Sequence, residues 1–105
     1  MLKMVVLLDR TADSTFEEFV EYWETEHAPL VDDLPGVKKY AISLPTDPDR
    51  SAYDGMAELY FEDMDALGAA FETEAGKALQ ADLPRFAETG ETLYVEETVL
   101  RDDTA

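Results

Sequence analysis

Residues 3–9 constrain the fold more than any other part of the chain, because apolar side chains occupy both alternating sets of an extended segment. In a β-strand, successive side chains point to opposite faces of the sheet. One set holds Val5 and Leu7, and the other holds Met4, Val6 and Leu8. A strand that is apolar on both faces is buried on both faces. We therefore expect residues 3–9 to form a strand that is covered from both sides.

An amphipathic helix is predicted to begin after residues 13–15, which supply a cap for its first turn. Ser14 and Glu17 fit the capping box S-x-x-E. Pro29 disfavours helical geometry at the residue before it, so the helix should end near His27. Glutamates occupy one side of this helix. The other side is an apolar stripe at helical spacing, made of Phe16, Phe19, Val20, Trp23 and His27.

The remaining pattern predicts three more strands and a second helical region. The strands span residues 37–44, 54–61 and 91–100, and a turn at Thr89-Gly90 precedes the last one. The helical region runs from its cap Asp63 to Phe86, with a break around Thr73 and Gly76. The order is β-α-β-β-α-β. The chain is thus predicted to be a single α+β domain, residues 1–105, with a ferredoxin-like, four-stranded antiparallel sheet and its helices on one face.

The strand at residues 54–61 is also apolar on both sides. Ala57, Leu59 and Phe61 form one side, and Met56 and Tyr60 belong to the other. Two helices cover only one face of a four-stranded sheet, so the other face would expose a large apolar area. The simplest cover is the same face of a second copy, related by a two-fold axis. The sequence therefore predicts a homodimer.

The chain carries 25 acidic and 8 basic residues, which gives a net charge of −17. Nucleic acids and anionic membrane surfaces both require basic patches, so neither is an expected partner. At molar salt the Debye length falls to about 3 Å, and most of the self-repulsion is screened. We interpret the acidity as halophilic adaptation of a cytoplasmic protein. An ordinary acidic protein is the alternative.

Several kinds of site are excluded or disfavoured by what the sequence lacks. Without cysteine there is no disulfide framework and no thiolate chemistry. No apolar run approaches the ~18 residues of a membrane span. The apolar segment at residues 1–8 is followed directly by Asp9-Arg10, so it is too short for a signal peptide. Glu24-x-x-His27 has a di-iron spacing but occurs once. With a single histidine, we expect no metal site and no tightly held cofactor.

Three blocks of the sequence resemble the EthD family of dimeric α/β barrel proteins. Family members more often carry Trp where Tyr60 stands, but the similarity spans nearly the whole chain. The blocks are Phe16-x-x-Phe19-x-x-Tyr22-Trp23-x-x-x-His27-Ala28-Pro29-Leu30, then Leu34-Pro35-Gly36-Val37 with Tyr40 three residues on, and Tyr53-Asp54-Gly55-x-Ala57-Glu58-Leu59-Tyr60-Phe61.

The resemblance implies a homodimer whose two sheets face each other with the helices outside. It also implies a pocket in each subunit between the sheet and the helices. Related dimeric barrels include cofactor-free lactone isomerases, polyketide cyclases and quinone-forming monooxygenases. Because kinship in fold does not transfer a reaction, the substrate is left open.

His27 is the only histidine and lies on the apolar side of the first helix. An imidazole that faces the sheet can act as a general acid or base. From spacing alone, a packed histidine bonded to a backbone carbonyl and a nearby carboxylate is the simpler interpretation. The resemblance implies that this histidine lies in the pocket, and on that basis His27 is the predicted catalytic residue.

Four further residues are predicted to contact the substrate: Trp23, Tyr40, Tyr60 and Glu58. Trp23 would form a wall of the pocket. A strand tyrosine can orient a polar substrate, but it is more often a packed aromatic with a satisfied hydroxyl. Glu58 lies among apolar neighbours, so it needs a partner base or a position at the dimer seam.

Two functions of different classes remain. The first is a cofactor-independent enzyme of catabolic or polyketide-like chemistry, an isomerase, cyclase, dehydratase or oxygenase, in which His27 moves a proton on a small apolar or aromatic molecule. The second is a non-catalytic ligand-binding or accessory homodimer, in which His27 fixes one hydrogen bond. The two differ in whether a bound ligand is turned over.

Overall fold

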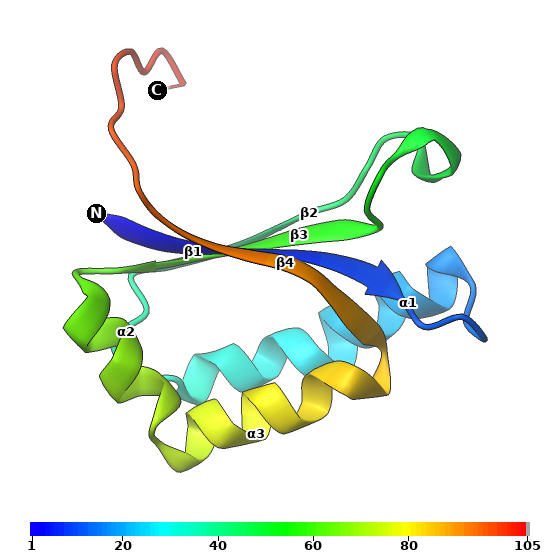
Figure 1. The fold of residues 1–105 in the computed structure, drawn as a ribbon, viewed down its shortest axis with the longest axis horizontal. Coiled ribbons are helices and arrows are strands. Elements are labelled where there is room, and N and C mark those ends of the chain that lie inside the picture. The colour runs from blue at the N-terminus through cyan, green and yellow to red at the C-terminus, as the bar shows by residue number, and fades with distance from the viewer. Residues whose placement is uncertain (105) are drawn as a thin grey trace.

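Four strands form one antiparallel sheet in the order β2-β3-β1-β4, and three α-helices cover one of its faces (Figure 1). The computed structural model describes residues 1–104. Its strands are β1 (Leu2–Arg10), β2 (Lys39–Ser43), β3 (Gly55–Phe61) and β4 (Ala87–Glu96), and its α-helices are α1 (Phe16–Tyr22), α2 (Met64–Phe71) and α3 (Glu74–Asp82). The predicted α+β, ferredoxin-like fold is confirmed. In this part of the chain, no helix is long and apolar enough to cross a membrane.

The first helix is capped one residue later than the sequence suggested. The Thr15 side chain accepts a hydrogen bond from the Glu18 backbone N–H, and the Glu18 carboxylate accepts one from the Thr15 N–H. The capping box is therefore Thr15 with Glu18, and the expectation of Ser14 with Glu17 is wrong. Ser14 is engaged elsewhere, since its hydroxyl donates to the Thr11 carbonyl at 3.0 Å.

Helical structure also continues beyond the predicted end at His27. After α1 the chain forms a π-helical turn, η1 (Trp23–His27), and then a 3-10 helix, η2 (Ala28–Asp33). Pro29 stands in the first turn of η2, where a missing N–H removes no internal hydrogen bond. The proline therefore marks a change of helix type rather than the end of the helical segment.

The second half of the fold contains one confirmed break and one corrected turn. Thr73 separates α2 from α3, and its side chain caps α3 by accepting from the Gly76 N–H. The predicted turn at Thr89-Gly90 lies inside β4, which begins at Ala87 and ends at Glu96. The pairing with β1 passes from Leu7↔Glu91 to Leu8↔Thr89, so Gly90 is an extra residue in a β-bulge.

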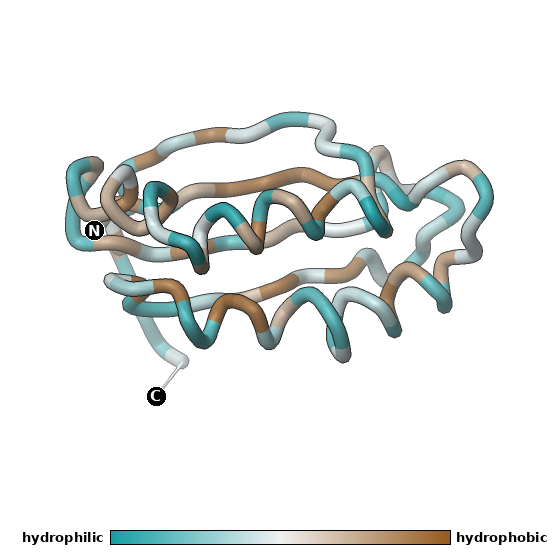
Figure 2. Tube along the Cα trace, turned by 90° about the horizontal axis from the view of Figure 1, so that it is seen from below, coloured by the Kyte–Doolittle hydropathy of each residue, from teal (hydrophilic) through white to brown (hydrophobic). Residues whose placement is uncertain are grey.

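The core lies between the sheet and the helices. Side chains of β1 and β3 meet the apolar sides of the helices there, and Figure 2 shows hydrophobic and hydrophilic residues alternating along those helices. Phe61, Trp23, Phe19 and Leu8 are the largest fully buried side chains. The short helix η4 (Leu83–Arg85) and Phe86 connect α3 to β4 and complete the floor of this layer.

Among residues 1–104, no α-helix covers the opposite face of the sheet, and the chain after β4 runs on that side (Figure 1). Leu93 is 43% exposed on it. The register aligns Leu93 with Val5, and Val5 with Glu58, so these three residues share this open face. Beyond β4, the tail residues Val99 and Leu100 are exposed as well.

Candidate functional site

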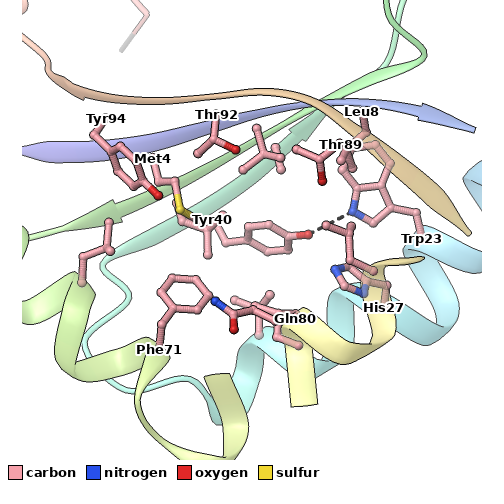
Figure 3. A pocket seen from close by; sticks show the side chains of 17 residues that line it. Met4, Leu8, Trp23, His27, Tyr40, Phe71, Gln80, Thr89, Thr92 and Tyr94 are labelled. Atoms are coloured by element: carbon pink, nitrogen blue, oxygen red, sulfur yellow. Dashed lines mark hydrogen bonds between the residues drawn. The ribbon is translucent and has the colours of Figure 1, made fainter. Parts of the chain in front are cut away.

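A cavity of about 260 Å³ lies between the sheet and the helices. All four strands contribute to its upper wall, and η1, η2, α2, α3 and η4 contribute to its floor (Figure 3). Trp23 and His27 stand at one end, and Phe71 and Tyr94 at the other. Thr92 and Tyr94 of β4 are exposed, so the cavity opens along this edge strand.

His27 is buried at the end of η1, with 6% of its surface exposed. Its Nδ1 lies 2.8 Å from the Asp82 Oδ2, and its ring lies 4.8 Å from the ring of Phe86 between centroids. A carboxylate only accepts hydrogen bonds, so Nδ1 carries the proton in this pair. Among residues 1–104 no group bonds Nε2, and no buried side-chain nitrogen or oxygen lacks a partner. Nε2 therefore faces open space, and the open space beside His27 is the cavity.

Asp82, at the end of α3, bonds the His27 ring and is fixed in turn by other side chains. Its Oδ1 accepts a hydrogen bond from the Tyr22 hydroxyl at 2.8 Å, and that bond raises the pKa of Tyr22. The Arg85 Nε lies 3.9 Å from the same oxygen, on the exposed side. Sequence reasoning missed Asp82. The available signal was its spacing, because Asp82 lies three residues after Leu79 and four before Phe86, on the apolar side of the helix.

Trp23 and Tyr40 are linked across the cavity. Trp23 is fully buried, and its Nε1–H donates to the Tyr40 hydroxyl oxygen at 3.2 Å (Figure 3). The indole only donates, so the proton of the Tyr40 hydroxyl stays available for another acceptor. Burial raises the pKa of Tyr40 and keeps that proton in place at neutral pH. Tyr40 therefore presents a hydrogen-bond donor to the cavity.

Trp23 and His27, which line the same cavity, are the first and last residues of the π-helical turn η1. Within the turn, the Ala28 N–H bonds the Trp23 carbonyl, and the Thr25 hydroxyl donates to the Glu21 carbonyl at 2.7 Å. Single π-turns are rare and occur often at functional sites. Because one π-turn barely changes the spacing of apolar residues, the sequence pattern could not reveal it.

Gly55, at the start of β3, leaves the space that the Trp23 indole occupies. A Cβ on Gly55 would collide with the six-membered ring of Trp23. The absence of a side chain at position 55 is therefore a packing requirement of the cavity wall.

Glu58 and Tyr60 lie on the opposite face of the sheet and do not line the cavity. The register pairs Tyr40 with Leu59, and both line the cavity, so both face the helices. Glu58 and Tyr60 flank Leu59 in β3, so their side chains point to the other face. The interpretation that Tyr60 and Tyr40 share one pocket is corrected by this alternation. Of the five predicted site residues, the structure brings together Trp23, His27 and Tyr40.

On the open face, Glu58 and Tyr60 belong to a charged cluster around Lys3. The Lys3 Nζ lies 2.6 Å from Glu58 Oε2 and 3.0 Å from Glu97 Oε2, and the Tyr60 hydroxyl donates to Glu97 at 3.1 Å. The two carboxylates raise the pKa of Lys3, and the bond from Lys3 lowers the pKa of Glu97. Glu58 thus has the partner base that its apolar surroundings demand.

Comparison with known proteins identifies relatives along the whole chain. Residues 12–90 match the family model of the EthD domain. An uncharacterized 11.0 kDa protein of the thcB-thcC intergenic region of Rhodococcus erythropolis is 37% identical over 106 residues, which cover 95% of this chain and 99% of that protein.

Solved structures share the fold at lower identity. HapK from Hahella chejuensis has a TM-score of 0.78 at 19% identity, covering 100% of this chain and 99% of its own. SnoaB, a cofactor-independent oxygenase from Streptomyces nogalater, has a TM-score of 0.72 at 14% identity, with 96% and 97% covered. A dimeric ferredoxin-like protein of unknown function from Thermobifida fusca has a TM-score of 0.69 at 18% identity, with 90% and 86% covered.

Proposed function

This chain belongs to the EthD domain family, and from that premise we propose that it is a cofactor-independent enzyme in which His27 transfers a proton to and from a small apolar or aromatic molecule. The observation that carries the proposal is the pairing of Nδ1 with Asp82 at 2.8 Å, which leaves Nε2 toward the cavity. An imidazole oriented by a carboxylate through one nitrogen is prepared to accept a proton through the other.

The chemistry starts with removal of a proton from the substrate. Nε2 of His27 accepts a proton from a C–H or O–H group beside a carbonyl, and Asp82 stabilises the imidazolium that forms. The Tyr40 hydroxyl donates a hydrogen bond to the oxygen on which negative charge develops. Isomerisation, cyclisation, dehydration and cofactor-independent oxygenation of such molecules share this first step. The fold likeness to the oxygenase SnoaB is compatible with it and selects none of the four.

A proton-exchange assay tests the proposal without knowledge of the natural substrate. In D₂O, NMR measures how fast the methyl protons of 2-acetylnaphthalene, an enolisable ketone, are replaced by deuterium. The wild type should accelerate this exchange, and His27→Gln should reduce the acceleration by about 10²–10⁴-fold, the usual share of general acid–base catalysis. Glu26→Gln, an exposed change within the same turn, is the matched control and should exchange like the wild type.

Two results separate this proposal from the non-catalytic alternative. Equal acceleration by wild type and His27→Gln would contradict a proton-transfer role for the imidazole. A ketone that binds in the cavity and is never exchanged, with the same affinity for both proteins, would favour a ligand-binding or accessory protein. A lower unfolding temperature of His27→Gln with unchanged exchange would assign His27 to packing, at a cost of ~1–3 kcal/mol for its unsatisfied partner.

The proposed assembly is a homodimer formed by the open faces of two sheets. Leu93 is 43% exposed on this face, and Val5 and Leu7 of the neighbouring strand share it. Apolar side chains exposed on an uncovered sheet face, here beside the charged cluster around Lys3, usually mark an interface. Light scattering in molar KCl should return twice the chain mass for the wild type and a single chain mass for Leu93→Asp. A monomer mass for the wild type at micromolar concentration would contradict the proposal.

A further inference from the structure

The cavity is uncharged although the chain as a whole is rich in charge. Asp, Glu, Lys and Arg make up 31% of the sequence, so about five of 17 lining residues would be charged if the lining were a random sample. Among the lining residues of the described chain, none belongs to these four types. His27 is the one lining residue of the described chain that carries an imidazole.

The carboxylate that bonds the lining residue His27 is already engaged. Asp82 lies behind His27, where both of its carboxylate oxygens accept hydrogen bonds, one from His27 and one from Tyr22. Arg85 contacts the outer side of Asp82, and its side chain is 74% exposed rather than directed into the cavity. A ligand in the cavity therefore meets no free cation for an anionic group and no free carboxylate for a cationic group.

A charged ligand would lose its hydration on entry and gain no partner charge in return, which weakens its binding relative to a neutral ligand of the same size. The net charge of −17 adds long-range repulsion for anions. The neutral polar groups of the lining instead suit a ligand with hydroxyl or carbonyl oxygens. These groups belong to Tyr40, Gln80, Thr89 and Thr92, and they lie between the aromatic rings at the two ends (Figure 3).

We infer that the cavity selects uncharged ring compounds with a carbonyl or hydroxyl group, and that it rejects carboxylates and ammonium ions of the same size. This inference rests on the proposed function, because it names the substrate class on which His27 would act. The carbonyl end would lie near Tyr40 and His27, and the ring near Phe71 and Tyr94.

Three naphthalene probes of similar size test this selectivity by titration calorimetry in 2 M KCl at pH 8. High salt screens the long-range field, so the comparison reports the local lining. The neutral 2-acetylnaphthalene should bind at least tenfold more tightly than 2-naphthoate and than 2-naphthylmethylammonium. Equal or tighter binding of either ion, or binding of none of the three probes, would overturn the inference.

A designed charge provides the decisive variant. Gln80→Lys places a cation at the cavity wall, on an exposed position of α3 that tolerates it, and should reverse the preference in favour of 2-naphthoate. Ala78→Lys adds the same charge to the same helix at an exposed position that does not line the cavity, and should leave the neutral probe preferred. A preference that is unchanged in Gln80→Lys, or reversed in Ala78→Lys, would overturn the inference.

The outcome is independent of catalysis. A neutral-selective cavity that never exchanges the ketone protons would refute the proposed enzyme and leave the selectivity intact. Proton exchange by a protein that prefers 2-naphthoate would refute the selectivity alone.

Discussion

The carboxylate of Asp82 lies 2.8 Å from Nδ1 of His27, although 55 residues separate the two in the sequence. The contact joins the end of α3 to the end of η1, so it exists only when both helical segments are packed on the sheet. Tyr22 fixes the second carboxylate oxygen, and Phe86 stacks on Tyr22 with ring centroids 5.2 Å apart. The orientation of the imidazole is thus a property of the folded helix layer.

Asp82→Asn tests whether this contact orients the imidazole. The amide can still accept one hydrogen bond, but it does not require the proton to stay on Nδ1. We expect ketone proton exchange to fall by about 10²-fold, the cost of misplacing a catalytic group, and the ring to populate the tautomer with the proton on Nε2. Nitrogen-15 NMR of the ring reads the tautomer, which a purely structural role would leave unchanged. Full exchange activity with an unaltered tautomer would contradict the positioning role.

Gly55→Ala should destabilise the protein by roughly 1–3 kcal/mol, the usual cost of overpacking, because the new methyl group collides with the Trp23 ring. The measurement is urea unfolding followed by the fluorescence of Trp23, the single tryptophan. Gly68→Ala is the matched control, since a methyl group at this position of α2 would meet no neighbouring group within 4 Å. It should stabilise the helix by about 0.5–1 kcal/mol. Similar effects of the two changes would contradict the packing at Gly55.

The fold followed from the sequence wherever side-chain periodicity decides the structure. The doubly apolar residues 3–9 form β1, which pairs with both β3 and β4, and the break around Thr73 separates α2 from α3. Errors occurred where local hydrogen bonds decide. Thr15 rather than Ser14 caps α1, the helical segment continues through Pro29, and Gly90 is a bulge inside a strand rather than a turn.

The candidate site was predictable only in part. The helical stripe of Trp23 and His27 indicated a common surface, and Tyr40 of β2, which was also predicted as a site residue, lines the same cavity. Strand alternation alone does not show which face of the sheet the helices cover, so Tyr60 was grouped with Tyr40. Asp82 escaped prediction because its partner His27 is remote in the sequence and the packing of α3 against η1 depends on tertiary structure.

Lys3→Met tests the charged cluster of the open face through pH. Lys3 lowers the pKa of Glu97 below its ordinary value of 4.5. The Glu97 carboxylate therefore stabilises the fold fully above pH 4.5, and this stabilisation is lost as the pH falls through the lowered pKa. Because the pKa of Lys3 is raised, its charge stabilises the fold fully below pH 10.5, and this stabilisation is lost only at higher pH. Loss of melting temperature in the variant should be largest between these pH values and should shrink below pH 4.5.

Lys77→Met removes the same charge from an exposed position on α3 and serves as the control. It should change the melting temperature little across the same pH range. A melting difference for Lys3→Met that is independent of pH would mean that the cluster does not stabilise the fold through its charges.

Salt should stabilise the protein. With a net charge of −17, raising KCl from ~0.1 M to several molar shortens the Debye length from about 10 Å to less than 3 Å and relieves repulsion that acts most strongly in the compact state. The unfolding midpoint should therefore rise across this range. A flat or falling midpoint would show that the acidic surface is not an adaptation to salt.

The most direct test of His27 as the proton acceptor of the cavity is a nitrogen-15 NMR spectrum of the imidazole. His27 is the only histidine, so a uniformly labelled sample gives the two ring nitrogens of a single residue. At pH 8 we expect the neutral ring to show a protonated Nδ1 and an unprotonated Nε2, and 2-acetylnaphthalene to shift the Nε2 signal while Nδ1 stays bonded to Asp82. A protonated Nε2 in the neutral ring, or an Nε2 signal unchanged at saturating ketone, would contradict the assignment.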